Sequence, residues 1–124
     1  REEHATLTQE GAAVGTPAYM APESVSSRVK AKPSLDVYGL AATLYHLQTL
    51  VSPYAGSPAR IMAAVATRDP KPAARVRPGL PLDVQAILDH GLERQPEKRY
   101  PTTAAMEADL RSFLAFRPVS VRPT

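Results

Sequence analysis

The chain has 124 residues, 44% of them hydrophobic, which is enough for the core of one modest domain and too little for two. It contains no cysteine, which excludes disulfide bonds and thiolate metal sites. Its formal net charge of +3 comes from arginines and lysines that are scattered along the sequence, a distribution that disfavours a nucleic-acid-binding arm.

The sequence shows no membrane segment. Asp36, His46 and Gln48 interrupt its most apolar stretch, residues 35–51, so no run approaches the roughly 18 to 20 apolar residues that span a bilayer. The first four residues, REEH, do not resemble a signal peptide. We therefore expect a soluble, cytoplasmic protein or a soluble part of a longer one.

Residues 1–33 have neither helical nor strand periodicity and are rich in Thr, Ser, Gly and Pro. We expect a long N-terminal loop here, with a short helix near residues 22–28. Irregular segments of this length in compact domains are usually functional or disordered.

A central helix is predicted to begin at Ser34, which is placed to cap it, with Asp36 in the first turn where a negative charge suits the helix dipole. Apolar residues then recur with helical spacing at Val37, Leu40, Ala41, Leu44 and Leu47. Leu35, Tyr38 and Tyr45 widen the apolar surface to most of the circumference, so we expect this helix to be nearly surrounded by the rest of the domain.

Three more helices are predicted, and no strand candidate is convincing. Ser57 and Pro58 are suited to the N-cap and first turn of a helix over residues 59–67. The proline-rich residues 68–81 should form a connector without regular structure. Helical spacing returns over residues 82–92 and 103–115. Residues 117–124 read as an extended linker or tail with polyproline character.

Three ordered stretches carry a family resemblance. Residues 15–23 read GTPAYMAPE, residues 36–41 read DVYGLA, and residues 95–100 read QPEKRY. The first resembles the end of the activation segment, with its Ala-Pro-Glu motif, in eukaryotic-like (Hanks-type) bacterial Ser/Thr protein kinases. The second resembles the start of that family's central hydrophobic helix, and the third resembles the segment before its last helix. The resemblance covers residues 5–116.

The resemblance implies a mainly α fold, namely the C-terminal portion of the kinase large lobe, with helices packed around a central hydrophobic helix. It also implies that Glu23 forms a buried ion pair with Arg99. An arginine suits this role because its planar fork can hold a carboxylate through two hydrogen bonds. The alternative is that the two residues are unrelated surface charges.

Further site residues follow from the same resemblance. It assigns Gly15, Thr16, Pro17 and Tyr19 to the floor that receives the protein substrate, whereas plain loop geometry is the alternative role. It relates Asp36 to the aspartate that accepts backbone hydrogen bonds from the catalytic loop.

Thr6 and Thr8 resemble regulatory positions of the activation loop and are candidates for autophosphorylation. Their alternative role is that of ordinary solvated threonines in a loop.

The sequence lacks several motifs of the intact family, namely His-Arg-Asp, Asp-Phe-Gly, the glycine-rich phosphate loop and the Val-Ala-x-Lys strand. We therefore expect no catalytic residue in this chain, and ATP and Mg²⁺ are implied for the intact kinase only. The histidines His4, His46 and His90 have no metal-ligand spacing, so we expect helix-surface roles for the last two and no metal site.

The sequence thus predicts part of a Ser/Thr protein kinase, a partial kinase domain over residues 1–116 with a tail over 117–124. Its expected partners are protein substrates and the remainder of the kinase domain. Because parts that would cover the central helix are missing, we also expect exposed apolar surface and self-association. The alternatives are a pseudokinase lobe or a non-catalytic helical docking module.

Overall fold

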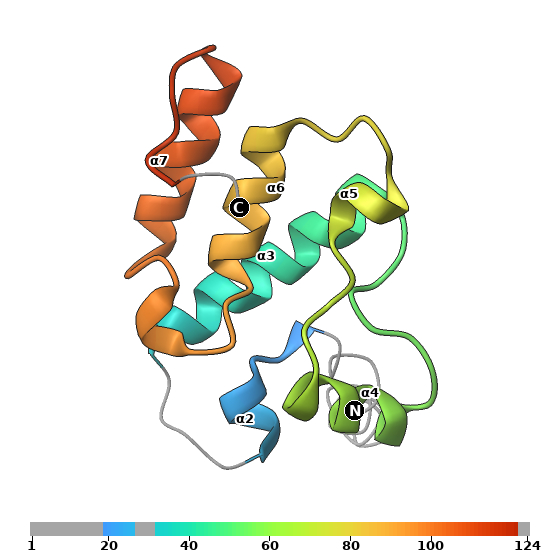
Figure 1. Ribbon diagram of the computed structural model, residues 1–124. Coiled ribbons are helices and arrows are strands. Elements are labelled where there is room, and N and C mark those ends of the chain that lie inside the picture. Colours follow the sequence, from blue (N-terminus) through green and yellow to red (C-terminus); the bar gives the residue numbers. More distant parts are fainter. Residues whose placement is uncertain (1–18, 27–31, 122–124) are drawn as a thin grey trace, which may run out of the picture.

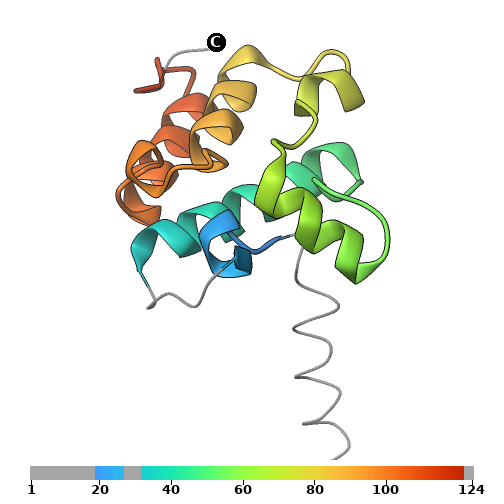
Figure 2. The same ribbon diagram turned by 60° about the horizontal axis from the view of Figure 1, so that its bottom comes forward.

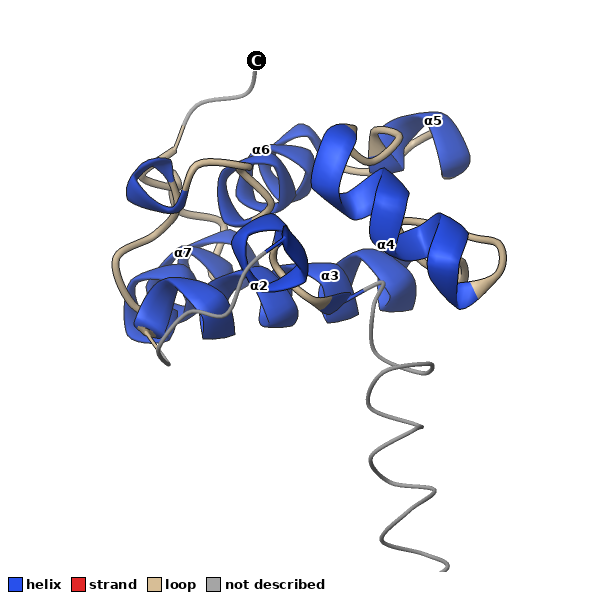
Figure 3. Ribbon diagram, turned by 90° about the horizontal axis from the view of Figure 1, so that it is seen from below, coloured by secondary structure: helices blue, strands red, loops and turns tan. Residues whose placement is uncertain are grey.

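The computed structural model describes residues 19–26 and 32–121, and every element in these ranges is helical (Figure 3). Gly15, Thr16, Pro17 and the two candidate phosphorylation sites, Thr6 and Thr8, lie outside the described residues. The elements in chain order are α2 (Pro22–Ser26), α3 (Pro33–Thr49), α4 (Pro58–Thr67), α5 (Ala73–Val76), α6 (Leu82–Gly91), the 3-10 turn η2 (Pro96–Lys98) and α7 (Thr103–Leu114).

Helix α3 is the centre of the fold. In Figures 1 and 2 it runs through the middle of the molecule, with α6 and α7 on one side and α2 and α4 on the other. It contacts α5, α6, α7 and η2. Its buried face is formed by Val37, Tyr38, Ala41, Ala42 and Tyr45. The main hydrophobic core is therefore assembled around this one helix.

The buried face of α3 differs from the predicted stripe. Leu40 is exposed, and Leu47 keeps 67% of its surface exposed, so the prediction of a nearly surrounded helix is wrong for the described part of the chain. The reason is that α5, α6 and α7 all pack against the side that carries Tyr38, Ala42 and Tyr45. The leucines on the other side have no covering element among the described residues. The expected exposed apolar surface is therefore present.

The ends of α3 also depart from expectation. Lys32, in an extended conformation, is the N-cap, and Pro33 takes the first helical position. Proline suits that place because its fixed φ is helical and the missing N–H would have no intrahelical acceptor there. Ser34 is thus inside the first turn and does not cap the helix. At the other end, Leu50 adopts the left-handed conformation, with φ of 65°.

Helix α4 begins as the sequence predicts. The side chain of Ser57 accepts a hydrogen bond from the backbone N–H of Arg60, and Pro58 follows it. The helix packs against α2, and its buried Val65 forms a small second core with Tyr54 and the partly buried Val25. This second core holds the segment that contains Glu23 beside α4.

The predicted connector contains a short helix that the prolines were expected to prevent. Helix α5 occupies Ala73–Val76, four residues with no proline among them. Ala73 is completely buried, and the N–H of Ala74 donates to the side chain of Gln85 on α6 at 2.7 Å. Tertiary contacts, together with the α6 side chain, stabilise a turn that local propensity alone did not predict.

Helices α6 and α7 form close to the predicted ranges. Where α6 passes α3, Gly91 allows a close approach, since a Cβ at this position would lie 2.7 Å from the Cβ of Ala41. The side chain of Thr102 caps α7 by accepting from the N–H of Ala105 at 3.1 Å. Met106 of α7 is fully buried, whereas Leu114 is exposed. The two helices therefore cover one side of α3.

The first part of the tail is not free of the domain. Val119 and Val121 pack against the main core, and Ser120 is hydrogen-bonded to Asp109 of α7. The expectation of a simple extended linker thus fails for residues 119–121, because they lie on α7. None of the described helices is both long enough and apolar enough to span a membrane.

Candidate functional site

The centre of the candidate site is the pairing of Glu23 with Arg99. Nη1 and Nη2 of Arg99 donate to Oε2 and Oε1 of Glu23 at 2.7 and 2.8 Å. The Arg99 side chain is completely buried, and Glu23 keeps 21% of its side chain exposed. Glu23 lies in the first turn of α2, and Arg99 directly follows η2. The predicted ion pair is therefore present in the bidentate form, although one partner remains partly exposed.

Arg99 uses every N–H group of its guanidinium. Beyond the two bonds to Glu23, Nε donates to the carbonyl of Glu93 at 2.6 Å, Nη1 to that of Ser34 at 3.1 Å, and Nη2 to that of Arg94 at 3.2 Å. The guanidinium also lies over the ring of Tyr38, 5.0 Å from its centroid, a cation–π arrangement.

Arg99 therefore ties α2, the start of α3 and the loop after α6 to one buried charge. Sequence reasoning missed the three carbonyl partners, because a backbone acceptor leaves no signal in the residue type.

The surroundings of Glu23 favour its charged form. Burial would raise the pKa of this carboxyl, but the hydrogen bonds and positive charge of Arg99, with a smaller contribution from Lys32, outweigh burial and lower the pKa. A charge-assisted bidentate bond is stronger than a neutral one. The pair is thus ionised at neutral pH and anchors the segment that begins at Tyr19.

Tyr19 is the one predicted substrate-floor residue that the structure describes. Its hydroxyl and Nδ1 of His46 on α3 are 2.5 Å apart, and the two rings are stacked with centroids 6.1 Å apart. His46 lies on α3, as predicted, but is half-buried, and its contact with the loop was not predicted. The two residues are 27 positions apart, so no local pattern could have revealed the contact. Segment 19–23 is therefore attached to the helices at both of its ends.

Asp36 is exposed in the first turn of α3 and does not contribute to the Glu23 and Arg99 cluster. Its proposed role toward a catalytic loop remains a prediction. The substrate-floor roles of Gly15, Thr16 and Pro17, and the phosphorylation of Thr6 and Thr8, also remain predictions.

Arg94 is a further arginine of the site that sequence reasoning missed. Its Nη1 donates to the carbonyls of Val65 and Ala66 at the end of α4, at 3.2 and 2.7 Å. Its Nε lies 3.8 Å from the carboxylate of Asp69. Because its own carbonyl accepts from Arg99, Arg94 joins α4 to the ion pair. The two arginines together fix α2 and α4 relative to the core.

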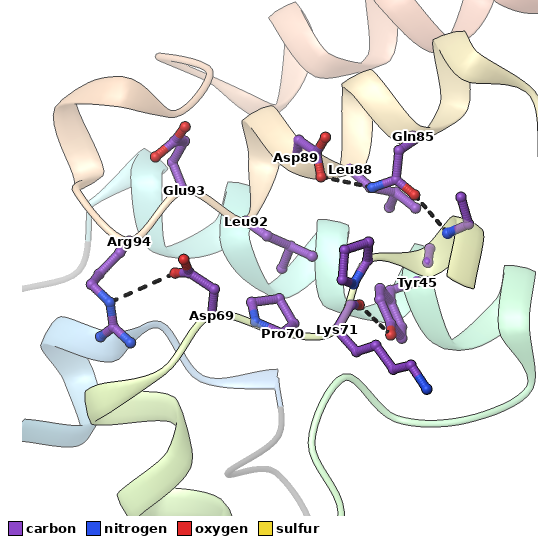
Figure 4. Close-up of a pocket in the computed structure, with 13 residues that line it drawn as sticks. Tyr45, Asp69, Pro70, Lys71, Gln85, Leu88, Asp89, Leu92, Glu93 and Arg94 are labelled. Atoms are coloured by element: carbon purple, nitrogen blue, oxygen red, sulfur yellow. Dashed lines mark hydrogen bonds and ion pairs between the residues drawn. The ribbon is translucent and has the colours of Figure 1, made fainter. Parts of the chain in front are cut away.

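A cavity of about 410 Å³ lies between the connector after α4 and the side of α6 (Figure 4). In Figure 4, Arg94 and Glu93 stand at one end, and Lys71 and Gln85 stand at the other. The hydroxyl of Tyr45 donates to the carbonyl of Lys71 at 2.6 Å, which holds the connector against α3.

No group of three or more His, Cys, Asp or Glu side chains within residues 19–26 and 32–121 could hold a metal ion. The described side chains form a network that holds the segment containing Tyr19 and Glu23 against the helices.

Comparison with known proteins agrees with the geometry. The model of the protein kinase domain family matches residues 3–110. The chain is 38% identical over 110 residues to the serine/threonine-protein kinase PknE of Mycobacterium tuberculosis. The aligned region covers 88% of this chain and 19% of that protein. It is 36% identical over 107 residues to PknB of Mycobacterium leprae, covering 85% of this chain and 17% of that protein.

The chain spans about a fifth of the length of these curated relatives. The family match, in contrast, extends over nearly all of the chain, and it includes both Glu23 and Arg99. The mainly helical fold around α3 and the bidentate ion pair are consistent with that match. The chain therefore belongs to the protein kinase domain family.

Proposed function

We propose that this chain forms the protein-substrate side of the large lobe of a Ser/Thr protein kinase. In the intact cytoplasmic enzyme, the γ-phosphate of ATP would pass, with Mg²⁺, to a serine or threonine of a protein. The observation that carries the proposal is the five-donor arrangement of Arg99 beneath the segment that includes Tyr19 and Glu23.

The role assigned to this chain is positioning. Phosphoryl transfer is catalysed almost entirely by placing the reacting groups and stabilising their charge. Tyr19 is bonded to His46 on α3, and Glu23 is bonded to Arg99, so the segment between them is held at both ends. A segment fixed in this way can serve as the end of a rigid floor on which a substrate peptide lies.

The proposal assigns ATP and Mg²⁺ to other parts of the intact kinase, because the motifs that hold them are absent from this sequence. It also assigns an intramolecular partner to the exposed side of α3. Leu40 and Leu47 on α3, with Leu50 and Val51 directly after its end, are exposed large apolar residues, which we call the apolar strip. Apolar patches of this kind mark interaction sites, and we propose that the remainder of the kinase domain covers this one.

The test is a phosphoryl-transfer assay on the full-length protein that contains this chain. With ATP and Mg²⁺ it is expected to phosphorylate a general substrate such as casein. Glu23→Ala is expected to lower kcat/KM for the protein substrate by about tenfold or more, with little change in KM for ATP, because only the protein-substrate side is loosened.

The matched control is Arg111→Ala, which removes an exposed arginine from the outer face of α7 and should leave both constants unchanged. A full-length protein that binds ATP but transfers no phosphate would instead support the pseudokinase alternative. If Glu23→Ala changes kcat/KM for the protein substrate and KM for ATP by the same factor, the role in protein-substrate positioning is contradicted.

A further inference from the structure

Asp109 on α7 is a buried acid that the proposed function does not use. Only 4% of its surface is exposed, and Arg99 is the other buried charged residue of the described chain. Oδ2 accepts from the hydroxyl of Tyr100 at 2.6 Å and from the hydroxyl of Ser120 at 2.7 Å, and Oδ1 accepts from the backbone N–H of Ser120 at 2.7 Å. Two of its three described hydrogen bonds therefore come from one residue of the tail.

These bonds hold the tail in a reversed course. After α7 the chain turns at Phe116, which has a left-handed φ of 59°, and Figure 1 shows the following residues running back beside α7. The N–H of Arg117 donates to the carbonyl of Ser112 at 2.8 Å. Val119 and Val121 pack against the main core on either side of Ser120. We call residues 117–121 the docked tail.

The exposure of Ser120 differs from that of Asp109, its hydrogen-bond partner. Ser120 is exposed, and it lies on non-helical backbone, although its hydroxyl reaches the buried carboxylate. In the sequence it stands between Arg117 and Arg122. An exposed serine on non-helical backbone becomes accessible to a modifying enzyme once its hydroxyl leaves Asp109.

The environment of Asp109 keeps the acid ionised. Burial would raise the pKa of Asp109, but the hydrogen bonds from Tyr100 and from the N–H and hydroxyl of Ser120 outweigh burial and lower it. His90, whose ring contacts Tyr100 edge-on with centroids 4.6 Å apart, adds a smaller stabilisation of the charge. A second anion placed at the Ser120 hydroxyl would therefore meet a full negative charge.

We propose that Ser120 is a phosphorylation site and that a phosphate on its Oγ releases the docked tail from α7. The hydroxyl oxygen would attack the γ-phosphorus of ATP, so that the Oγ–P bond forms and the bond from that phosphorus to the bridging oxygen breaks. ADP leaves, and the hydroxyl proton is released. The product carries nearly two negative charges, and the hydroxyl donor to Asp109 is lost.

Repulsion between the phosphate and Asp109 favours release of the docked tail, and so does the loss of the hydrogen bond from the Ser120 hydroxyl. A phosphate next to an aspartate is disruptive, and here the aspartate is buried. Docking and phosphorylation are thus mutually exclusive. By linkage, docking protects Ser120 from modification and phosphorylation prevents docking. The inference goes beyond the proposed function, since it concerns the tail and does not depend on which protein kinase modifies it.

The docking part is tested on four forms of the 124-residue chain: unmodified, phosphoserine at 120, Ser120→Ala, and phosphothreonine at Thr124. The readout is amide hydrogen exchange at residue 120 by NMR, with the amide of Ile87 in α6 as a check that the fold persists. Phosphoserine at 120 is expected to speed exchange at residue 120 by roughly tenfold or more and to leave Ile87 unchanged.

The other forms separate repulsion from the loss of one hydrogen bond. Ser120→Ala keeps the backbone N–H that donates to Asp109 and should retain most of the protection. Phosphothreonine at Thr124 adds the same charge four residues away and should behave as the unmodified chain does. A phosphoserine form that exchanges no faster than Ser120→Ala would overturn the proposed release.

The modification itself is tested on the full-length protein isolated from the cells that make it. Peptide mass spectrometry is expected to find phosphate on Ser120. A protein without phosphate on Ser120 in both growing and stationary cells would overturn the proposed site. This result is distinguishable from failure of the proposed function, which shows itself as absent transfer from ATP to casein.

Discussion

Glu23 and Arg99, 76 positions apart in the chain, meet through two parallel hydrogen bonds of 2.7 and 2.8 Å. The carboxylate comes from the first turn of α2, and the guanidinium comes from the loop before α7. Every N–H of Arg99 has an acceptor, and the pair is one of the points at which the described N-terminal segment is attached to the helical core.

Arg99→Lys is expected to lower the free energy of unfolding by about 2 kcal/mol or more, although the charge is kept. A lysine cannot form the bidentate bond to Glu23, cannot reach all three carbonyls, and loses the planar contact with Tyr38. Urea unfolding followed by circular dichroism measures the change.

The control for that experiment is Arg111→Lys. Arg111 pairs with Glu107 on the exposed face of α7 at 2.8 Å, and such a pair contributes roughly 0 to 0.5 kcal/mol. Equal losses of unfolding free energy in Arg99→Lys and Arg111→Lys would show that the buried guanidinium of Arg99 contributes no more than an exposed one.

Acid is expected to weaken the fold through Glu23 and Asp109. Both pKa values are lowered in the folded chain from ordinary values of 4.5 and 3.8. The unfolded chain therefore takes up protons first as the pH falls. The stability that these groups contribute is complete above about pH 5 and is lost as the pH drops through their lowered pKa values. Urea midpoints measured from pH 6 to pH 3 should show this decline.

Variants identify the groups responsible for the decline. Glu23→Gln and Asp109→Asn should be less stable than the original chain at pH 6, and each should lose less stability on acidification. If the urea midpoint falls with pH as steeply in both variants as in the original chain, other groups control the acid sensitivity.

Two buried tyrosines allow a matched test of hydrogen bonding. The Tyr100 hydroxyl donates to Asp109, whereas the Tyr38 hydroxyl, which interacts with that of Tyr54, has no charged hydrogen-bond acceptor among the described residues. Tyr100→Phe should cost about 1.5 to 3 kcal/mol, since it removes a bond to a charged acceptor. Tyr38→Phe should cost less than Tyr100→Phe, because the bond that it removes has no charged acceptor. Thermal unfolding ranks the two, and a larger loss for Tyr38→Phe would contradict the assignment.

Alanine substitutions at two glycines are expected to change the stability in opposite directions. A Cβ at Gly91 would meet the Cβ of Ala41 at 2.7 Å, so Gly91→Ala must separate α6 from α3 and should destabilise by about 1 to 3 kcal/mol. A Cβ at Gly39 would have only an ordinary contact of 3.6 Å with the carbonyl of Tyr19. Gly39→Ala should therefore stabilise α3 by up to about 1 kcal/mol. A stabilising Gly91→Ala would show that the helices do not cross this closely.

The apolar strip on α3 predicts self-association of the isolated chain. Leu47 and Leu50 are 67% and 81% exposed. The double variant Leu47→Lys/Leu50→Lys is expected to bind less hydrophobic dye and to sediment as a smaller species than the original chain at equal concentration. Leu114→Lys, an exposed leucine on α7 outside the strip, is the control. A monomeric original chain without dye binding would refute the prediction.

Features set within one or two turns were predictable. Ser57 and Pro58 specify the start of α4, and the spacing of Val84, Ile87 and Leu88 specifies the buried face of α6. Capping and helical periodicity depend on residues no more than four positions apart, so they can be read directly from the sequence. The same local rules predicted the wrong N-cap at Ser34, because Pro33 occupies the first helical position of α3 and Lys32 is the N-cap.

Features that join distant positions were predictable only where a family motif carried them. The pairing of Glu23 with Arg99 followed from the resemblance, and the structure contains it. The contacts of Tyr19 with His46 and of Asp109 with Ser120 had no such motif, and neither was predicted. The carbonyl partners of the two arginines were equally hidden, since any residue type supplies a carbonyl.

By itself the sequence determined the helical class, the start of α4, the ranges of α6 and α7, and membership of a kinase-like group through its ordered motifs. The tertiary structure alone decided which face of α3 is buried, that α5 forms among prolines, and that the tail returns to Asp109. The physical reason is that helix formation is governed by neighbours along the chain, whereas burial and the pairing of buried charges depend on which elements pack together.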